Sequence, residues 1–239
     1  MSQAGSILGS GGSGGGSFAP NKTITEFDDF LDNSTATNKL QWATIGSLDP
    51  SASFTRLNTN PGQLIYLSSN SHSGLTLSPG DTALTAPFQL GSGTFNMNWV
   101  MDLTTLSVGG ARYTIYIGLL FYADVAASSP PTSGVYFQYS DNVNAGNWQI
   151  VCNNSSTSTT HNTSTPAATG FHNYGIQINA AATSAAFTIN GVIVANSPIT
   201  TNFPTLPVGP GFFSLASSGT LPAQVVDLFY YTQVLTTAR

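Results

Sequence analysis

The chain has 239 residues, and only 6 % of them are charged, against roughly 25 % in an average soluble domain. Five Lys and Arg residues against ten Asp and Glu residues leave a formal net charge of -5, which excludes the basic surface that nucleic-acid binding requires. The N-terminus lacks the apolar core of a secretory signal, and no apolar run reaches the roughly 20 residues that cross a bilayer. We therefore expect synthesis as a soluble cytoplasmic product, with neither nucleic-acid binding nor membrane insertion.

Residues 1–20 form a polar arm rich in Gly and Ser. Such a stretch has too few large apolar side chains to bury a face of its own. The sizeable apolar side chains of the arm are Ile7, Leu8 and Phe18, and we predict that they anchor the chain to neighbouring subunits. The remaining residues, 21–239, are predicted to form one domain.

The segment that follows the arm leaves two alternatives open. Residues 23–26 (TITE) fit a capping box, and Ile24, Phe27, Phe30 and Leu31 lie near helical spacing. The aspartates of this segment and the Asn-Ser-Thr run after it favour turns instead. The segment is therefore predicted to be either one helical turn or an opening strand.

From Leu40 onward the patterns are almost all typical of strands. Residues 94–103 alternate strictly between polar and apolar side chains, which predicts one buried face. Residues 112–123 (RYTIYIGLLFYA) are apolar on both faces, as in a central strand that is covered on both sides. The side chains of the first pattern that are predicted to face the core are Phe95, Met97, Trp99, Met101 and Leu103.

Two hairpins are predicted in the second half of the chain. One turns at 144–146 (NAG), and the other at Asn190-Gly191, a pair that suits the two positive φ angles of a type I′ turn. About ten to twelve short strands favour an all-β fold, a two-sheet antiparallel β-sandwich of the jelly-roll kind. The strands of this part are predicted at 135–139, 148–152, 174–179, 186–189, 192–195, 211–216 and 224–231.

The titratable residues show no pattern that is typical of catalysis. Glu26 is the only glutamate, so the chain lacks the strand-borne pair of glutamates that glycoside hydrolysis would use. The histidines have no metal-ligand spacing, and the only cysteine, Cys152, is predicted to be a buried small side chain. We therefore expect no catalytic residue, metal or cofactor. The histidines are His72, His161 and His172, and the separately placed aspartates are Asp81, Asp102, Asp124, Asp141 and Asp227.

The loop at 140–148 (SDNVNAGNW) is a candidate for glycan binding, because its Asn, Asp and aromatic content is common at carbohydrate sites. Two interpretations of its tryptophan are open. The ring could stack on a sugar, or it could pack in the core together with Trp42 and Trp99, which is the interpretation that we favour. The candidate glycan contacts are Asp141, Asn144 and Trp148.

Several motifs resemble the concanavalin A-like jelly-roll domains of phage and bacterial proteins. In that family an F-H-x-Y-x-I strand precedes an F-x-I-N-G hairpin, and residues 171–176 (FHNYGI) and 187–191 (FTING) follow this order. The similarity covers roughly residues 24–234. Further matching segments are 27–32 (FDDFLD), 40–42 (LQW), 134–137 (GVYF) and 147–150 (NWQI).

The resemblance implies a fold that lectins, glycan hydrolases and inert structural modules share. The chain lacks the Glu-x-Asp-x-x-Glu catalytic strand of the hydrolases and a recognisable calcium and manganese ligand cluster of the legume lectins. Its opening Met-Ser-Gln-Ala-Gly, followed by the Gly/Ser tract, resembles the start of phage virion proteins.

We therefore predict a non-enzymatic structural component of a phage virion, a tail, fibre or capsid appendage. It would be located in the virion and would assemble through its arm with other virion proteins and with copies of itself. The alternative is a carbohydrate-binding adhesin or receptor-binding module, whose partner is a host surface glycan. A glycan hydrolase ranks third.

Overall fold

The computed structural model describes residues 23–28, 42–45, 53–56, 63–67, 72–77, 88–126, 129–219 and 221–236. The arm at 1–20, with Ile7, Leu8 and Phe18, lies outside these residues. Apart from one short helix, α1 (Tyr122–Ala126), and one 3-10 turn (Asn144–Gly146), the regular structure of the described residues consists of strands. The described segments contain no helix with the length and apolar character to cross a membrane.

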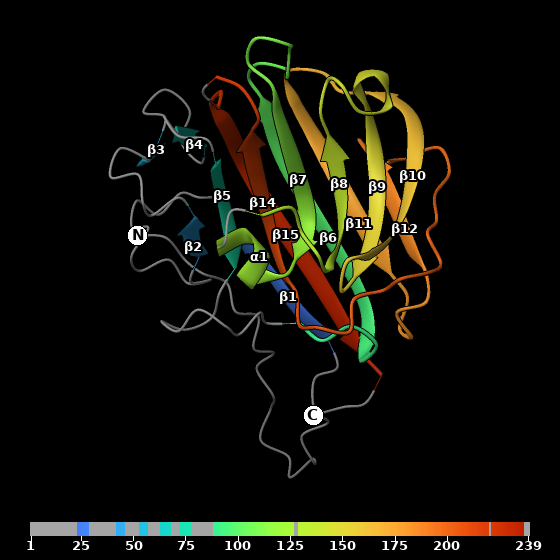
Figure 1. The fold of residues 1–239 in the computed structure, drawn as a ribbon. Helices are drawn as coiled ribbons and strands as arrows, with labels where there is room; N and C mark the ends of the chain where they lie inside the picture. The colour runs from blue at the N-terminus through green and yellow to red at the C-terminus, as the bar shows by residue number, and fades with distance from the viewer. Residues whose placement is uncertain are drawn as a thin grey trace, which may run out of the picture.

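The strands form two antiparallel sheets. The β6 sheet has the order β13-β12-β11-β6-β15-β4-β3, with β1 also paired to β15, and the β7 sheet has the order β10-β9-β8-β7-β14-β5-β2. In Figure 1, β7, β8, β9 and β14 lie in front of β6, β11, β12 and β15. This arrangement confirms the predicted two-sheet sandwich.

The bounds of the strands are as follows. The β6 sheet contains β1 (Thr23–Asp28), β3 (Ser53–Arg56), β4 (Leu64–Leu67), β6 (Gly93–Leu103), β11 (Phe171–Ile178), β12 (Ala185–Ile189), β13 (Val192–Ile193) and β15 (Gln224–Leu235). The β7 sheet contains β2 (Trp42–Ile45), β5 (His72–Leu77), β7 (Tyr113–Leu120), β8 (Gly134–Tyr139), β9 (Asn147–Asn154), β10 (Thr157–Pro166) and β14 (Gly209–Ala216).

The core lies between the two sheets and is rich in aromatic rings. The ring of Phe137, on the β7 sheet, lies 5.7 Å from Tyr174 and 5.2 Å from Phe187, which belong to the β6 sheet. Burial alternates along β6 as predicted, because successive side chains of a strand point to opposite faces. Each predicted core residue of this strand is at most 1 % exposed: Phe95, Met97, Trp99, Met101 and Leu103.

The structure decides between a helical turn and a strand at residues 23–28. It also shows that one predicted strand is shorter than expected. Residues 23–28 form a strand, β1, which pairs with β15 from Thr23 opposite Val234. The strand predicted at 112–123 ends at Leu120, and α1 follows it. The chain then turns back toward β8.

Both predicted hairpins are confirmed. Strands β8 and β9 pair around the turn at Asn144–Gly146, with Gln138 opposite Gln149. Strands β12 and β13 pair around Asn190 and Gly191, whose φ angles are 53° and 77°. Positive φ at both turn positions fits the type I′ hairpin that the Asn-Gly pair predicts.

Candidate functional site

The outer face of the β7 sheet carries an apolar cluster separate from the core between the sheets. Ile115 and Ile117 of β7 face the core, so the side chain of Tyr116 points to the opposite face. The outer aromatic cluster consists of Tyr116, Tyr136 and Phe213, each at most 4 % exposed. The ring of Tyr116 lies edge-on to Tyr136 at 5.6 Å and stacks on Phe213 at 6.3 Å. Leu120 and Val151 complete the cluster.

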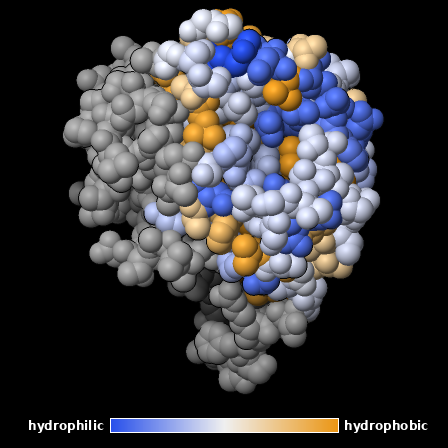
Figure 2. All heavy atoms as spheres, in the orientation of Figure 1, coloured by the Kyte–Doolittle hydropathy of each residue, from blue (hydrophilic) through white to orange (hydrophobic). Residues whose placement is uncertain are grey.

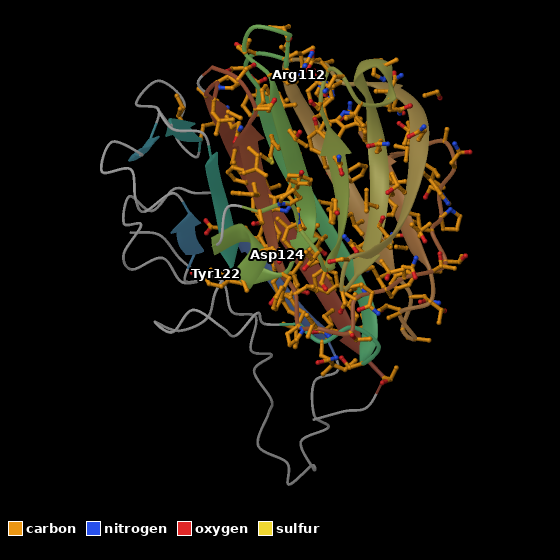
Figure 3. All side chains as sticks on the ribbon, viewed as in Figure 1. Arg112, Tyr122 and Asp124 are labelled. Atoms are coloured by element: carbon orange, nitrogen blue, oxygen red, sulfur yellow. The ribbon has the colours of Figure 1, made fainter. Side chains whose placement is uncertain are left out.

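The connection between β7 and β8 packs over part of this cluster. The Tyr136 hydroxyl donates to the Pro131 carbonyl at 3.3 Å, and Asn153 Nδ2 donates to the same oxygen at 2.8 Å. The Asp124 carboxylate accepts from Thr132 N at 2.6 Å and from Thr132 Oγ1 at 2.8 Å. Figure 3 shows α1, with Tyr122 and Asp124, in front of the sheet. Burial raises the pKa of Tyr136 to about 12.

A row of amide side chains continues from the aromatic cluster toward the edge of the sheet. Tyr116 of β7 lies opposite Gln138 of β8, which lies opposite Gln149 of β9. Gln149 lies opposite Asn162 of β10, and its Nε2 donates to Asn162 Oδ1 at 2.7 Å. We call Gln138, Gln149 and Asn162 the amide row. It runs across three neighbouring strands, directly beside Tyr116.

The amide row retains hydrogen-bonding capacity. Within the described residues the Gln138 side chain makes no hydrogen bond, and each amide group offers two donor hydrogens and an acceptor oxygen. The next row on the same face adds the exposed hydroxyl of Thr160, which lies opposite Val151. In Figure 2 the atoms over this side of the face are mostly white to blue. The face is therefore polar but carries no charge in these two rows.

The predicted contact Asp141 takes part in a structural ion pair. Arg112 Nε lies 2.9 Å from Asp141 Oδ1, and the Ser107 hydroxyl donates to the same oxygen at 2.7 Å. The hydrogen bonds from Arg112 and Ser107 lower the pKa of Asp141 to about 2. The carboxylate thus stays ionised and ties two loops together. A glycan contact at Asp141 remains a prediction.

The other two predicted contacts serve the hairpin and the core. Asn144 Nδ2 donates to the carbonyls of Trp148 and Thr163, both at 2.9 Å, so both amide hydrogens are used. Trp148 is 1 % exposed, with its ring 4.9 Å from Tyr174 and 5.5 Å from Tyr139. A buried ring presents no face to a sugar. The glycan contact predicted at Trp148 is therefore wrong, and the core interpretation is confirmed.

The remaining predicted titratable residues make local contacts. Asp102 Oδ1 accepts from Gly170 N at 2.7 Å, and His161 Nδ1 lies 2.7 Å from the Asn196 carbonyl. His172 Nδ1 lies 2.9 Å from Asn190 Nδ2. Among the described residues, no three His, Cys, Asp or Glu side chains gather in a way that could hold a metal ion. Asp81 and the side chains of His72 and Trp42 lie outside the described part of the structure.

A family described as "SO2946-like, C-terminal domain" matches residues 60–228. The chain belongs to this family. No curated protein matches the sequence of this SO2946-like domain.

Solved structures with the same fold as the SO2946-like domain include lectin domains. The metal-free carbohydrate recognition domain of Emp46p is similar at a TM-score of 0.56 and 7 % identity, over 84 % of this chain and 91 % of that chain. Peanut lectin is similar at a TM-score of 0.52 and 13 % identity, over 90 % and 99 %. The concanavalin A-like jelly-roll fold is thereby confirmed. None of these comparisons supports a phage context.

The fold is also shared with enzymes. A GlcNAcα1-4Gal-releasing endo-β-galactosidase from Clostridium perfringens is similar at a TM-score of 0.55 and 11 % identity, over 94 % of this chain and 65 % of that chain. Because both lectins and glycosidases have this fold, the fold does not decide whether the SO2946-like domain is an enzyme.

Sequence reasoning missed the amide row. Its members occupy three different strands, and only the register between those strands brings them together. One signal was present in the sequence. Gln138 stands between the apolar residues Phe137 and Tyr139, and Gln149 stands between Trp148 and Ile150. The alternation therefore predicts that each glutamine points away from the core.

Proposed function

We propose that this SO2946-like domain is a non-enzymatic carbohydrate-binding module that receives a glycan on the outer face of the β7 sheet. The observation that carries the proposal is the amide row, whose three accessible side chains are aligned across three neighbouring strands. Amide groups can both donate to and accept from the hydroxyls of a sugar. Tyr116 is 4 % exposed, so its ring packs beside the row and offers no face to the glycan. Proteins named as a carbohydrate recognition domain and as a lectin share the fold, which supports this reading.

The two described rows of this face carry no charge, and the carboxylate of Asp124 beside them is held by Thr132, which favours a neutral glycan. Phe213, Tyr116 and the amide row carry no charged group, and neither does the neighbouring row of Tyr136, Val151 and Thr160. An anionic sugar would lose hydration here without meeting a cation, which is costly. The described face therefore suits uncharged hexoses or N-acetylhexosamines better than acidic glycans.

The carboxylates support a binding role over a hydrolytic one. A pair of carboxylates catalyses glycoside hydrolysis in most families of glycosidases. This chain has a single glutamate, Glu26, so a pair would need aspartates. Asp141 is held by Arg112 and Ser107, and Asp124 by Thr132. Neither aspartate lies in the amide row, so we assign no catalytic residue to this face.

A screen of immobilised neutral and acidic glycans tests the proposal. Gln149→Ala and Gln138→Ala remove amide groups without entering the core, and each should weaken binding of a neutral glycan by about tenfold, the equivalent of roughly 1.4 kcal/mol. Gln89→Ala is the control, because Gln89 is an exposed glutamine that lies outside the strands of both sheets. Binding that is absent for every neutral glycan, or that survives both amide variants unchanged, contradicts the proposal.

The virion role remains a prediction, and its assembly part rests on residues 1–20. Ile7, Leu8 and Phe18 are the anchors proposed there, and a virion location and assembly with other copies depend on them. Deleting residues 1–19 should leave the jelly roll folded but reduce its incorporation into particles. Undiminished incorporation of the truncated chain would refute the role of the arm.

A further inference from the structure

The opposite face of the sandwich carries a second ordered row of side chains. On the outer side of the β6 sheet, strand pairing places Phe27 of β1 opposite Tyr230 of β15, and Tyr230 opposite Asn98 of β6. Asn98 lies opposite Gly175 of β11, which in turn lies opposite Thr188 of β12. We call these five residues the back row. At a strand spacing of about 4.8 Å, the back row spans about 19 Å, the length of several pyranose units.

Gly175 lies between Asn98 and Thr188 in the back row and lets their side chains approach each other. It carries no side chain, and the Oγ1 of Thr188 and the Oδ1 of Asn98 lie over it from the two flanking strands. The Asn98 oxygen is 3.0 Å from the position that a Cβ on Gly175 would take, and the Thr188 oxygen overlaps that position. Two polar oxygens from neighbouring strands are thus held side by side on the sheet surface.

Two aromatic rings lie at one end of this polar strip. Phe27 is 56 % exposed, far more than an aromatic side chain that belongs to a core. Tyr230, the next residue in the row, is half-buried and hydrogen-bonded through its hydroxyl to Thr232 Oγ1. An exposed ring, a phenol, an amide and a hydroxyl therefore follow one another across the sheet.

We propose that the back row is a second glycan-binding site, which takes a neutral pyranose chain laid across the strands. The Phe27 ring offers an apolar surface for the C–H face of one sugar, while the Asn98 and Thr188 side chains hydrogen-bond the hydroxyls of others. The neighbouring row, Thr25, Thr232, Asn96 and Gln177, is also uncharged. The inference shares its ligand class with the proposed function but uses a different sheet.

The composition of the face favours a glycan over a second copy of the chain. Large exposed apolar side chains occur at the ends of the back row, Phe27 at one end and Ile193, beside Thr188, at the other. Polar side chains occupy the positions between them. In a stable homodimer interface the buried centre is more apolar than the remaining surface. The back row has the opposite arrangement, with polar side chains at its centre and apolar ones at its ends.

Titration of the full ¹⁵N-labelled chain with cellohexaose, maltohexaose and chitohexaose tests the inference. At least one of these neutral oligosaccharides should shift the backbone amide signals of Asn98, Gly175 and Thr188. Phe27→Ala should raise the dissociation constant measured from these signals about tenfold or more. Phe171→Ala is the matched control, since Phe171 is also an exposed phenylalanine of the β6 sheet, at 43 %, but lies outside the back row. It should change the constant less than twofold.

The outcomes separate this inference from the proposed function. Shifts confined to the amide row leave the proposed function standing and overturn the back-row site, whereas shifts confined to the back row do the opposite. No shift on either face with any of the three sugars overturns both. Sedimentation velocity adds one further outcome: a dimer that Phe27→Ala dissociates would overturn the back-row site in favour of self-association.

Discussion

The guanidinium of Arg112 donates two hydrogen bonds to the carboxylate of Asp141, from Nε to Oδ1 at 2.9 Å and from Nη2 to Oδ2 at 3.1 Å. The Ser107 hydroxyl also donates to this carboxylate and in turn accepts from Tyr113 N at 3.1 Å. The loop before β7 is thereby fastened to the loop after β8. Figure 3 places Arg112 near one end of these strands, away from Tyr122 and Asp124.

The first prediction concerns the pH range in which this contact stabilises the fold. Arg112 and Ser107 lower the pKa of Asp141 to about 2, below the roughly 3.9 of an unfolded aspartate. A lowered pKa in the folded state contributes stability above the unfolded value, and that contribution is lost as the pH falls toward 2. Asp141→Asn should therefore lower the Tm at pH 7, and the difference from the parent should shrink between pH 4 and 2.

Thermal unfolding of both proteins across this pH range measures the effect, and Arg112→Ala supplies the second arm of a double-mutant cycle. A Tm difference that stays constant down to pH 2 would show that Asp141 acts through something other than its charge.

The second prediction separates the core role of Trp148 from any role in binding. Truncating a large buried aromatic side chain costs about 3–5 kcal/mol, so Trp148→Ala should strongly destabilise the domain. Trp148→Phe keeps a ring against Tyr174 and should fold with a smaller loss. Urea unfolding measures both variants. Loss of glycan binding by a fully folded Trp148→Phe variant would restore Trp148 as a contact.

Much of the fold could be read from local patterns, and the failures have physical causes. The row from Phe95 to Leu103 was predictable because its alternation matches the period of a strand. Strand β10 (Thr157–Pro166) was not predicted, since its Ser, Thr and Asn side chains show no apolar alternation. It is held by its register with β9 and by contacts such as Asn196 Nδ2 to the Asn162 carbonyl.

The candidate site was harder to predict from the sequence than the fold, for a related reason. The loop around Trp148 has the composition of a sugar site, but its tryptophan points into the core and its Asn144 holds the turn. The amide row depends on the pairing of β8 with β9 and of β9 with β10. Registers of this kind are properties of tertiary structure and leave almost no trace in a single sequence.

The third prediction uses Cys152 as a reporter of unfolding. Its thiol is buried, and burial raises its pKa to about 12, so almost none of it is thiolate at pH 8. Because it is the only cysteine of the chain, a disulfide-exchange reagent such as Ellman's reagent should release one equivalent of product in denaturant and almost none from the native protein. Rapid stoichiometric reaction without denaturant would contradict the packing of β9.

The last prediction compares two glycines that tolerate no side chain for different reasons. A Cβ on Gly175 would overlap the side chain of Thr188, whereas a Cβ on Gly118 would overlap the backbone at Val135 and Tyr136. Gly175→Ala should therefore destabilise the domain by about 1–3 kcal/mol, and most of this loss should disappear in a Thr188→Ala background, where the obstructing hydroxyl is gone.

Gly118→Ala should cost more, because the main chain of β8 cannot be removed and must shift together with its pairing to β7 and β9. Tyr136→Ala should give it no rescue. Urea unfolding of the two double-mutant cycles measures the coupling, which should be large for Gly175 with Thr188 and near zero for Gly118 with Tyr136. Equal losses for Gly175→Ala in both backgrounds would show that the Thr188 hydroxyl does not lie over the glycine, and would remove the two neighbouring oxygens from the back row.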